Sequence, residues 1–364
     1  MSSGSSPARK YRIVHWGTGN VGSLVLPTIL ERADFQVVGQ YVHNLEKVGR
    51  DTGELVGRAP IGVKATHDID ALIALEPDVL VHFGNAMFDP LGTARTFARF
   101  LEAGTNVVTT GLYEIGSRAV APQAFRDILE PACIKGRSSV YSTGADPGFA
   151  TTQLAITTLA VAHRVDAVRM QEFASYGEYA DEPALRHFMG YGGPLDAVSP
   201  MTTGDFARRN WTATVHDVAH ALGWQVDEFR VAHQFAPAKQ DRDTLIGRID
   251  RGTVSVIWMQ LIGVVDGAER VYLEHVNWMH PDDIPEHWPA PPRYRGQLAG
   301  VGYRVVVEGD PTYDVEMQIP GVRQGLMITG LHATNAIPLV VAAEPGIVDL
   351  ASLPNYAPGP LKRA

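Results

Sequence analysis

The chain has few of the residues and patterns that mark disulfide-rich, membrane-bound or nucleic-acid-binding proteins. A single cysteine, Cys133, among 364 residues cannot form an internal disulfide or a cysteine metal cluster. No apolar run approaches the ~20 residues that a membrane span needs, and the polar start MSSGSSPARK lacks the apolar core of a signal peptide. The net charge is −9, without a Lys/Arg block, so no nucleic-acid partner is expected. We expect a soluble, cytoplasmic protein without a metal, in which residues 1–10 form a disordered lead-in.

Strand-like and helix-like segments alternate through the first 147 residues. The apolar runs include RIVHW, FQVVGQYV, PDVLVHFG, TNVVTTG and RSSVYSTG. This alternation predicts an α/β domain over residues 11–147 with a Rossmann-type, doubly wound parallel sheet. From residue 148 the strands lengthen and alternate with period two, as in TVSVIWMQ, which predicts an α+β domain with a mixed, mostly antiparallel sheet over 148–330. We expect residues 331–364 to form a helical segment that returns to the first domain.

A glycine-rich loop follows the first strand and opens a helix. It fits G-x-G-x-x-G and consists of Gly17, Thr18, Gly19, Asn20, Val21 and Gly22. In such loops the first glycine makes the turn, the second admits a pyrophosphate, and the third lets helix and strand pack closely. The pattern in this βαβ context therefore predicts a dinucleotide, whose phosphates face the helix N-terminus.

The end of the second strand bears on which dinucleotide is bound. An acid there usually holds the ribose of a cofactor without a 2′-phosphate. This strand instead runs into His43 and Asn44, with Lys47 and Arg50 close behind and no acid before Glu46. Neutral and basic side chains favour NADP(H), with NAD(H) as the alternative. The same residues would also suit a solvated loop.

Polar and small residues follow the other predicted strands, whose carboxyl ends should line the ligand site. The candidates for cofactor binding are His82, Phe83, Gly84, Asn85, Thr110, Gly111, Asp146 and Pro147. A buried structural role is the alternative for His82. For Asp146 and Pro147 the alternative is to begin the next helix, as its N-cap and first residue.

The run NVVTTGLYE delivers one carboxylate, Glu114, beyond a strand end. Its plain alternative is a surface ion pair with Arg118. In a partly desolvated pocket the carboxyl would serve as a base and would stabilise a cationic iminium. Aromatic residues that could build such a pocket are Tyr113, Phe149, Tyr176 and Tyr179, with Phe188 and Tyr191 as further candidates.

Together, YRIVHWGTGNVG, YVHNLEKVGRDTGELVG, NVVTTGLYE, the DPGF turn and the terminal TNAIP resemble the dihydrodipicolinate reductase-like superfamily. The resemblance is closest to its branch of 2,4-diaminopentanoate dehydrogenases and native amine dehydrogenases. It implies an open-faced sheet that pairs in a homodimer, and reversible reductive amination. It also implies that Glu114 is the catalytic glutamate and that Asn335 lies near the nicotinamide. The alternative for Asn335 is that it caps the last helix. Asp146 stands where the family usually has Asn.

Three functions remain open on these grounds. The first is an NADP(H)-dependent amine dehydrogenase that acts on small ketones or aldehydes with ammonia. The second is a diamine or amino-acid dehydrogenase of the 2,4-diaminopentanoate type, which needs a further acid such as Glu178, Asp181 or Glu182 for the distal ammonium. The third is a non-catalytic, NADP-binding redox sensor. Dihydrodipicolinate reduction is disfavoured, because the His-His pair, the Lys and the P-S-G-T-A segment of those enzymes are absent.

Overall fold

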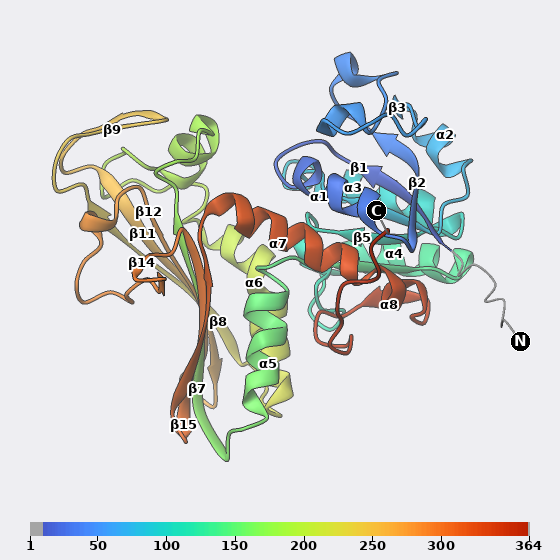
Figure 1. Ribbon diagram of the computed structural model, residues 1–364. Helices are drawn as coiled ribbons and strands as arrows, with labels where there is room; N and C mark the ends of the chain where they lie inside the picture. The colour runs from blue at the N-terminus through green and yellow to red at the C-terminus, as the bar shows by residue number, and fades with distance from the viewer. Residues whose placement is uncertain (1–9, 363–364) are drawn as a thin grey trace, which may run out of the picture. The chain divides into compact units, whose positions relative to one another are not determined.

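The computed structural model describes residues 10–362, which belong to two compact units (Figure 1). The first unit extends to Gly144 and resumes at Leu326, and the second is Ala145–Gly325. The expected domain limits at 147/148 and 330/331 thus fall a few residues after the observed ones. The expected lead-in lies, except for Lys10, outside the described residues.

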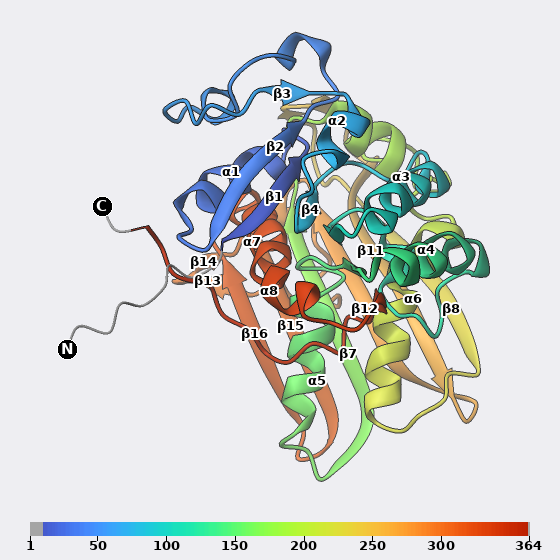
Figure 2. The same ribbon diagram turned by 90° about the vertical axis from the view of Figure 1, so that its right-hand side faces the viewer.

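The first unit is built on a seven-stranded sheet of order β17-β6-β5-β4-β1-β2-β3, in which every neighbouring pair is parallel. Figure 2 shows β3, β2, β1 and β4 side by side in this order. Its strands are β1 (Tyr11–Trp16), β2 (Phe35–Tyr41), β3 (Ala65–Thr66), β4 (Val79–His82), β5 (Asn106–Thr109), β6 (Ser139–Ser142) and β17 (Gly346–Val348). The central strands are short and fully buried, as strands covered by helices on both faces should be. The predicted Rossmann-type sheet is confirmed.

Helices connect these strands. They are α1 (Gly22–Glu31), α2 (Ile69–Ile73), α3 (Pro90–Glu102), α4 (Gln123–Gly136) and α8 (Ile337–Val341), with short turns η1 (Leu45–Lys47), η2 (Glu54–Val56) and η3 (Tyr113–Ile115). Helix α3 begins where Asp89 accepts a hydrogen bond from Gly92 N at 2.9 Å and Pro90 takes the first helical position. Its residues Phe97 and Phe100 are fully buried in the core of the unit.

Helix α7 (Val322–Asn335) carries the C-terminal segment into the first unit. It packs on α1 at Gly330, where an added Cβ would lie 2.3 Å from the side chain of Val25. The sole cysteine also lies in this unit. Burial raises the pKa of the Cys133 thiol to about 12, so this residue is an inert part of the core.

The second unit is built on a six-stranded sheet of order β16-β15-β7-β12-β11-β8. Its strands are β7 (Arg164–Ser175), β8 (Glu228–Pro237), β11 (Val254–Val265), β12 (Ala268–Trp278), β15 (Val301–Asp310) and β16 (Tyr313–Ile319). Only the β7–β12 pair is parallel. The predicted mixed, mostly antiparallel sheet is confirmed. Two small hairpins, β9 (Arg242–Thr244) with β10 (Gly247–Ile249) and β13 (Arg293–Tyr294) with β14 (Gln297–Leu298), complete its strands.

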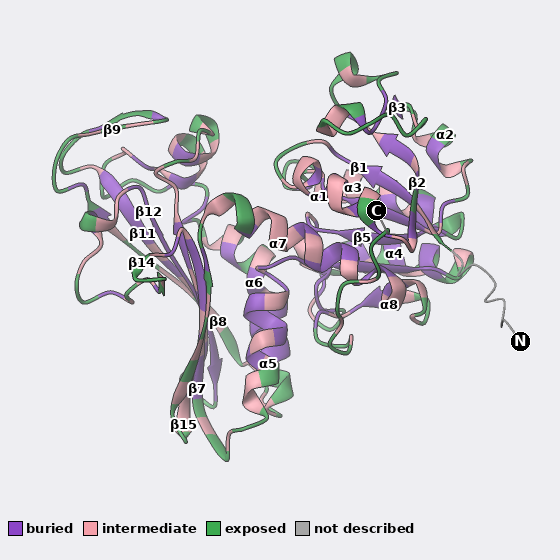
Figure 3. Ribbon diagram, viewed as in Figure 1, coloured by how far each residue is buried: buried purple, intermediate pink, exposed green. Residues whose placement is uncertain are grey.

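Helices α5 (Leu154–Leu159) and α6 (Gly204–Ala221) lie on one face of this sheet, where buried residues are concentrated (Figure 3). Side chains alternate with period two, so Met259 and Leu273 face Trp211 and Val215 of α6 in the core. The expected single helix GFATTQLAITTLAVAHR is shorter and begins as a wide π-helical turn, η4 (Phe149–Gln153). The remaining turns are η5 (Pro183–Met189) and η6 (Pro281–Asp283). No described helix is long and apolar enough to cross a membrane.

Candidate functional site

The glycine loop of the first unit has the geometry that a pyrophosphate requires. Gly17 has φ +101°, and a Cβ there would meet the Phe83 backbone at 3.3 Å. A Cβ on Gly22 would lie 2.1 Å from Gly17 O, so the start of α1 can pack against the turn only with glycine. A Cβ added to Gly19, by contrast, would meet nothing within 4 Å. The backbone of Gly19 therefore has open space beside it in which a ligand can approach. The first turn of α1 holds no acid that would repel an anion.

The segment after β2 brings one cation to this loop. Lys47 Nζ donates to Thr18 Oγ1 at 2.9 Å and lies 3.4 Å from Thr18 O. Asn44 Oδ1 accepts from Glu46 N at 2.9 Å and so caps η1, while His43 and Arg50 are exposed. Of the four residues predicted to select the cofactor, Lys47 is therefore the one fixed beside the glycine loop.

The residues predicted to bind the cofactor at the ends of β4 and β5 pack closely and are joined by hydrogen bonds that involve the backbone. Thr110 N donates to His82 O at 3.1 Å, and Gly111 N donates to Thr109 Oγ1 at 3.1 Å. Phe83 is buried, a Cβ on Gly84 would lie 2.5 Å from His82 Nε2, and Asn85 Oδ1 accepts from Met87 N at 2.8 Å.

The described contacts of His82 fit the buried structural role given above as the alternative to cofactor binding. Its Nδ1 lies 2.9 Å from Thr109 Oγ1, and the side chain is buried. Burial, with a smaller effect of His43, lowers the pKa of His82 to about 3, so the imidazole is neutral.

Glu114 lies in η3, just beyond the carboxyl end of β5, and is half-buried. The guanidinium of Arg118 pairs with Glu130, with Nε 2.6 Å from Glu130 Oε1. Arg118 N also donates to Asp349. The cation proposed as the plain alternative partner of Glu114 is thus committed to another acid. Glu114 stands at the ligand edge of a dinucleotide-binding sheet.

Asn335 lies elsewhere in the first unit. Its Oδ1 accepts from Arg32 Nη1 at 2.8 Å, and Arg32 also pairs with Asp34 at 2.7 Å. Arg32 follows the last residue of α1, so this contact lies ~15 Å along the helix from the glycine loop. The reason is that α7 runs beside α1 and reaches its far end. The described contacts give Asn335 a structural role and do not bring it to the other predicted cofactor residues.

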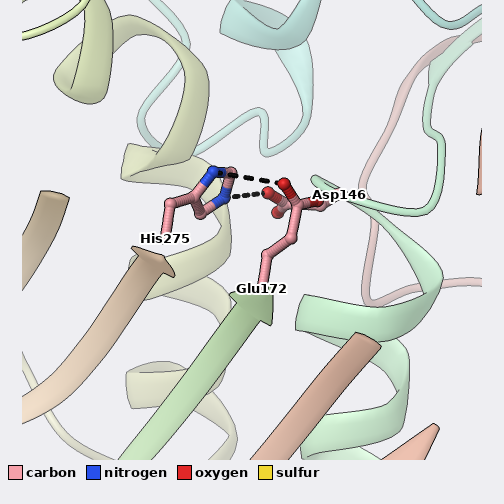
Figure 4. Close-up of side chains that lie close together, drawn as sticks. All are labelled: Asp146, Glu172 and His275. Carbon is pink, nitrogen blue, oxygen red and sulfur yellow. Dashed lines mark hydrogen bonds and ion pairs between the residues drawn. The ribbon is translucent and has the colours of Figure 1, made fainter. Parts of the chain in front are cut away.

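The second unit contains an ionisable cluster that sequence reasoning did not assemble (Figure 4). His275 of β12 has Nε2 2.5 Å from Asp146 Oδ2 and Nδ1 3.4 Å from Glu172 Oε1 of β7. Thr151 Oγ1 donates to Asp146 Oδ1 at 2.7 Å, so Asp146 does not cap the next helix. Glu172 lies opposite both His275 and Tyr303 in the sheet register, and Tyr303 hydrogen-bonds to it.

Charge within this cluster is governed by burial and by the mutual attraction of its members. Burial disfavours the imidazolium, but Glu172 and Asp146 together raise the pKa of His275 above its ordinary value. Burial likewise raises the pKa of Glu172. The Trp211 ring, 4.3 Å from the imidazole between centroids, adds a favourable contact for the cation.

This cluster offers three potential metal-ligand atoms within 4.8 Å of one another. However, the imidazole turns one nitrogen to each carboxylate, whereas a shared ion would need all three residues to aim at one point. The arrangement is that of an imidazole held between two acidic side chains.

The predicted pocket aromatics are divided between the units. Tyr113 belongs to the first unit, whereas Phe149 begins η4 of the second. Tyr176 packs edge-on against Tyr179 at 5.9 Å and contacts Tyr191 at 6.3 Å. Phe188, the remaining candidate, packs against Phe206 at 5.0 Å. The second unit thus groups three tyrosines.

The first unit is a Rossmann unit whose glycine loop can accept the phosphates of a dinucleotide, and the second is an α+β unit with a buried ionisable cluster. Together they define the class of two-unit NAD(P)-dependent dehydrogenases. Comparisons with known protein families agree with this class. Residues 11–128 match "Dihydrodipicolinate reductase, N-terminus", and residues 209–358 match "2,4-diaminopentanoate dehydrogenase C-terminal domain".

Full-length relatives narrow this class. The chain is 32% identical to an amine dehydrogenase of Streptomyces virginiae over 94% of its own length and 95% of the relative's. It is 21% identical to the 2,4-diaminopentanoate dehydrogenase of Acetoanaerobium sticklandii, over 95% and 94% of the two chains. Its fold matches an amine dehydrogenase structure from Mycobacterium smegmatis with a TM-score of 0.72, at 20% identity over 97% and 98% of the chains. The chain therefore belongs to the amine dehydrogenase family within the dihydrodipicolinate reductase-like dehydrogenases.

Proposed function

We propose that the protein is an NADP(H)-dependent amine dehydrogenase that converts small ketones or aldehydes and ammonia reversibly into primary amines. Membership of the family supports the reaction type. The observation that carries the proposal is the half-buried carboxylate of Glu114 at the ligand edge of the dinucleotide-binding sheet.

A carboxylate at this position suits imine chemistry. The bound reduced nicotinamide would supply the hydride. Glu114 would take a proton from the attacking ammonia and return one to the departing hydroxyl, and its charge would then stabilise the cationic iminium. Reduction of a ketone to an alcohol has no cationic acceptor of this kind and instead needs a proton donor at the alkoxide.

We further propose NADP(H) over NAD(H), with Lys47 as the residue that binds the 2′-phosphate. Lys47 already reaches the glycine loop through Thr18, and no acid of the kind that holds a free ribose ends β2. An ammonium group fixed at this place is a point charge for a phosphate.

We also propose a homodimer formed through the sheet face opposite α5 and α6. This face carries Glu274, which is 1% exposed and accepts from Gln171 at 2.8 Å and from Gln260 at 2.6 Å. Satisfied polar groups of this kind can be covered by a second copy without loss of hydrogen bonds. Light scattering should give a mass twice the 39.5 kDa of the chain. A mass of one chain contradicts the dimer.

The second candidate is a dehydrogenase of diamines or amino acids. The match of residues 209–358 to the 2,4-diaminopentanoate dehydrogenase domain favours it. Of the acids suggested for a distal ammonium, Glu178 and Glu182 are exposed and Asp181 caps the turn at Ala184 N at 3.1 Å.

The experiment is NADPH oxidation with a panel of small ketones and aldehydes, with and without concentrated ammonium at mildly alkaline pH. Turnover that requires ammonium supports reductive amination. Turnover without ammonium indicates a carbonyl reductase and contradicts the proposal. Tight NADPH binding without turnover of any substrate favours the sensor.

A further inference from the structure

A cavity of about 160 Å³ lies in the second unit, between the segment that follows η5 and the strands β8 and β11. The backbone ties this segment to the sheet, since Gly192 N donates to Val254 O and Val254 N donates to Gly193 O, each at 2.9 Å. The apolar part of the wall consists of Pro194, Ala197, Val198, Pro200, Phe235 and Val254. Arg186 and His187 of η5 also line the cavity, and no acidic residue among residues 10–362 does. The cavity therefore combines an apolar wall with basic groups.

Arg186 is fixed in place without being neutralised. Its Nε donates to Ile246 O at 2.8 Å and its Nη2 donates to Arg248 O at 2.7 Å, so two backbone carbonyls orient the guanidinium. Gly192 makes room for it, because a Cβ there would lie 2.6 Å from Arg186 Nη1. The ion pair with Glu182 is loose, with 3.9 Å between Nε and Oε1, and the Glu182 side chain is 60% exposed. Such a pair contributes little, so Arg186 keeps its charge and further N–H donors for a ligand.

The volume and the lining of the cavity set what such a ligand can be. A cavity of about 150 Å³ can hold benzene, which limits the ligand to roughly six non-hydrogen atoms. Basic side chains without an acidic one favour an anion. A carboxylate matches a guanidinium, because its two oxygens can accept parallel hydrogen bonds. Ser199 also lines the cavity, but its hydroxyl already hydrogen-bonds to Thr202, so Arg186 is the principal donor.

We propose that this cavity binds a short aliphatic monocarboxylate, with the carboxylate on Arg186 and the hydrocarbon chain against the apolar wall. A chain of about four carbons fits the volume and buries apolar surface. An amino acid is disfavoured, because its ammonium group would lie beside basic side chains with no acid to pair it. The reaction proposed above neither consumes nor forms a carboxylate. The cavity thus gives the second unit a ligand of a chemical class that this reaction does not use.

Binding can be tested without turnover. The full chain, without cofactor, is titrated calorimetrically with butyrate, acetate, butylammonium, 2-aminobutyrate and inorganic phosphate at neutral pH and constant ionic strength. Butyrate should bind saturably, and acetate, which is shorter by two CH₂ groups, should bind about 3- to 15-fold more weakly. Butylammonium has the wrong charge and 2-aminobutyrate carries an ammonium group, so neither should bind. Absence of butyrate binding, or equal binding of butylammonium, 2-aminobutyrate or phosphate, would overturn the inference.

Variants separate the site from the structural role of Arg186. Ala197 lines the cavity and is exposed, so Ala197→Phe should fill the cavity and leave the hydrogen bonds of Arg186 intact. It should weaken butyrate binding at least about tenfold with an unchanged Tm. Arg186→Lys keeps the charge but loses the planar fork, so butyrate binding should also weaken about tenfold, and Tm should fall with the lost carbonyl contacts. Arg251→Gln removes an exposed arginine of the same unit that does not line the cavity, and it should bind butyrate like the unaltered chain.

The outcomes also separate this site from the proposed function. Unchanged butyrate affinity in both Ala197→Phe and Arg186→Lys overturns the site, even if NADPH-dependent amination is observed. Butyrate binding that is lost in Ala197→Phe and retained in Arg251→Gln, in a protein that never aminates a carbonyl, supports the site and refutes the proposed function instead.

Discussion

The cofactor assignment makes a quantitative prediction for Lys47. Its ammonium group is half-buried and held 2.9 Å from Thr18 Oγ1, at the edge of the loop that would hold the pyrophosphate. A hydrogen bond from a charged group at such a position contributes about 1.5–3 kcal/mol. Since 1.4 kcal/mol is tenfold in affinity, Lys47→Ala should weaken NADPH binding by about 10- to 150-fold. We expect the lower part of this range, because Lys47 must share its donors with Thr18.

The assay is the dissociation constant of NADPH and of NADH, measured by the fluorescence of the reduced nicotinamide. NADH lacks the 2′-phosphate, so its affinity should change less than about threefold in Lys47→Ala. Arg50→Ala, which removes an exposed cation of the same loop, serves as the matched control and should lower NADPH affinity only slightly. Equal losses for NADPH and NADH in Lys47→Ala would refute the reasoning, because Lys47 would then only brace the glycine loop.

Gly22→Ala should abolish the binding of both dinucleotides, because its Cβ would lie 2.1 Å from Gly17 O; retained affinity in a binding titration contradicts the loop geometry. Acid should destabilise the first unit, since burial lowers the pKa of His15 to about 4 and of His82 to about 3, below their ordinary value near 6.5. The stabilisation that comes from keeping these imidazoles neutral in the folded state is fully present above pH 6.5. It is lost as the pH falls from 6.5 towards the pKa of the folded state, and for His15 the loss in the free energy of unfolding is about 3 kcal/mol. Denaturant unfolding at several pH values should show that the free energy of unfolding depends less on pH in His15→Gln than in the unaltered chain. An unchanged pH dependence in His15→Gln would contradict this role of His15.

Much of the first unit could be predicted because its signals are local. The glycine loop is a contiguous hexapeptide, and the positive φ of Gly17 and the contact at Gly22 are what its pattern demands. The position of Glu114 could be predicted because this residue comes soon after a strand of a parallel sheet, and the carboxyl ends of such strands line the ligand site. Asn335, by contrast, depends on how α7 packs along α1, and a short motif does not contain that information.

The cluster of the second unit depends on strand register. Glu172 and His275 are 103 positions apart and meet because β7 and β12 pair in parallel with these residues opposite each other. Register follows from packing of the whole sheet, which a single sequence does not display. One local signal was present. In the strand-like stretch VRMQEFA, Glu172 lies on the same face as the apolar Val168, Met170 and Ala174, where a charge requires a buried partner. No local motif around His275 indicates that it is this partner.

Single-turnover measurement of Glu114→Gln tests the central claim most directly. The variant keeps the size and hydrogen-bonding reach of the side chain and removes only its charge and basicity. Glu130→Gln, which alters the acid paired with Arg118, controls for lost charge in the same unit. With saturating NADPH, ammonium and a carbonyl substrate, Glu114→Gln should lose at least about 100-fold in the rate of NADPH oxidation. It should bind NADPH like the unaltered chain. Unchanged turnover in Glu114→Gln, or a loss explained by weaker NADPH binding, would contradict the account.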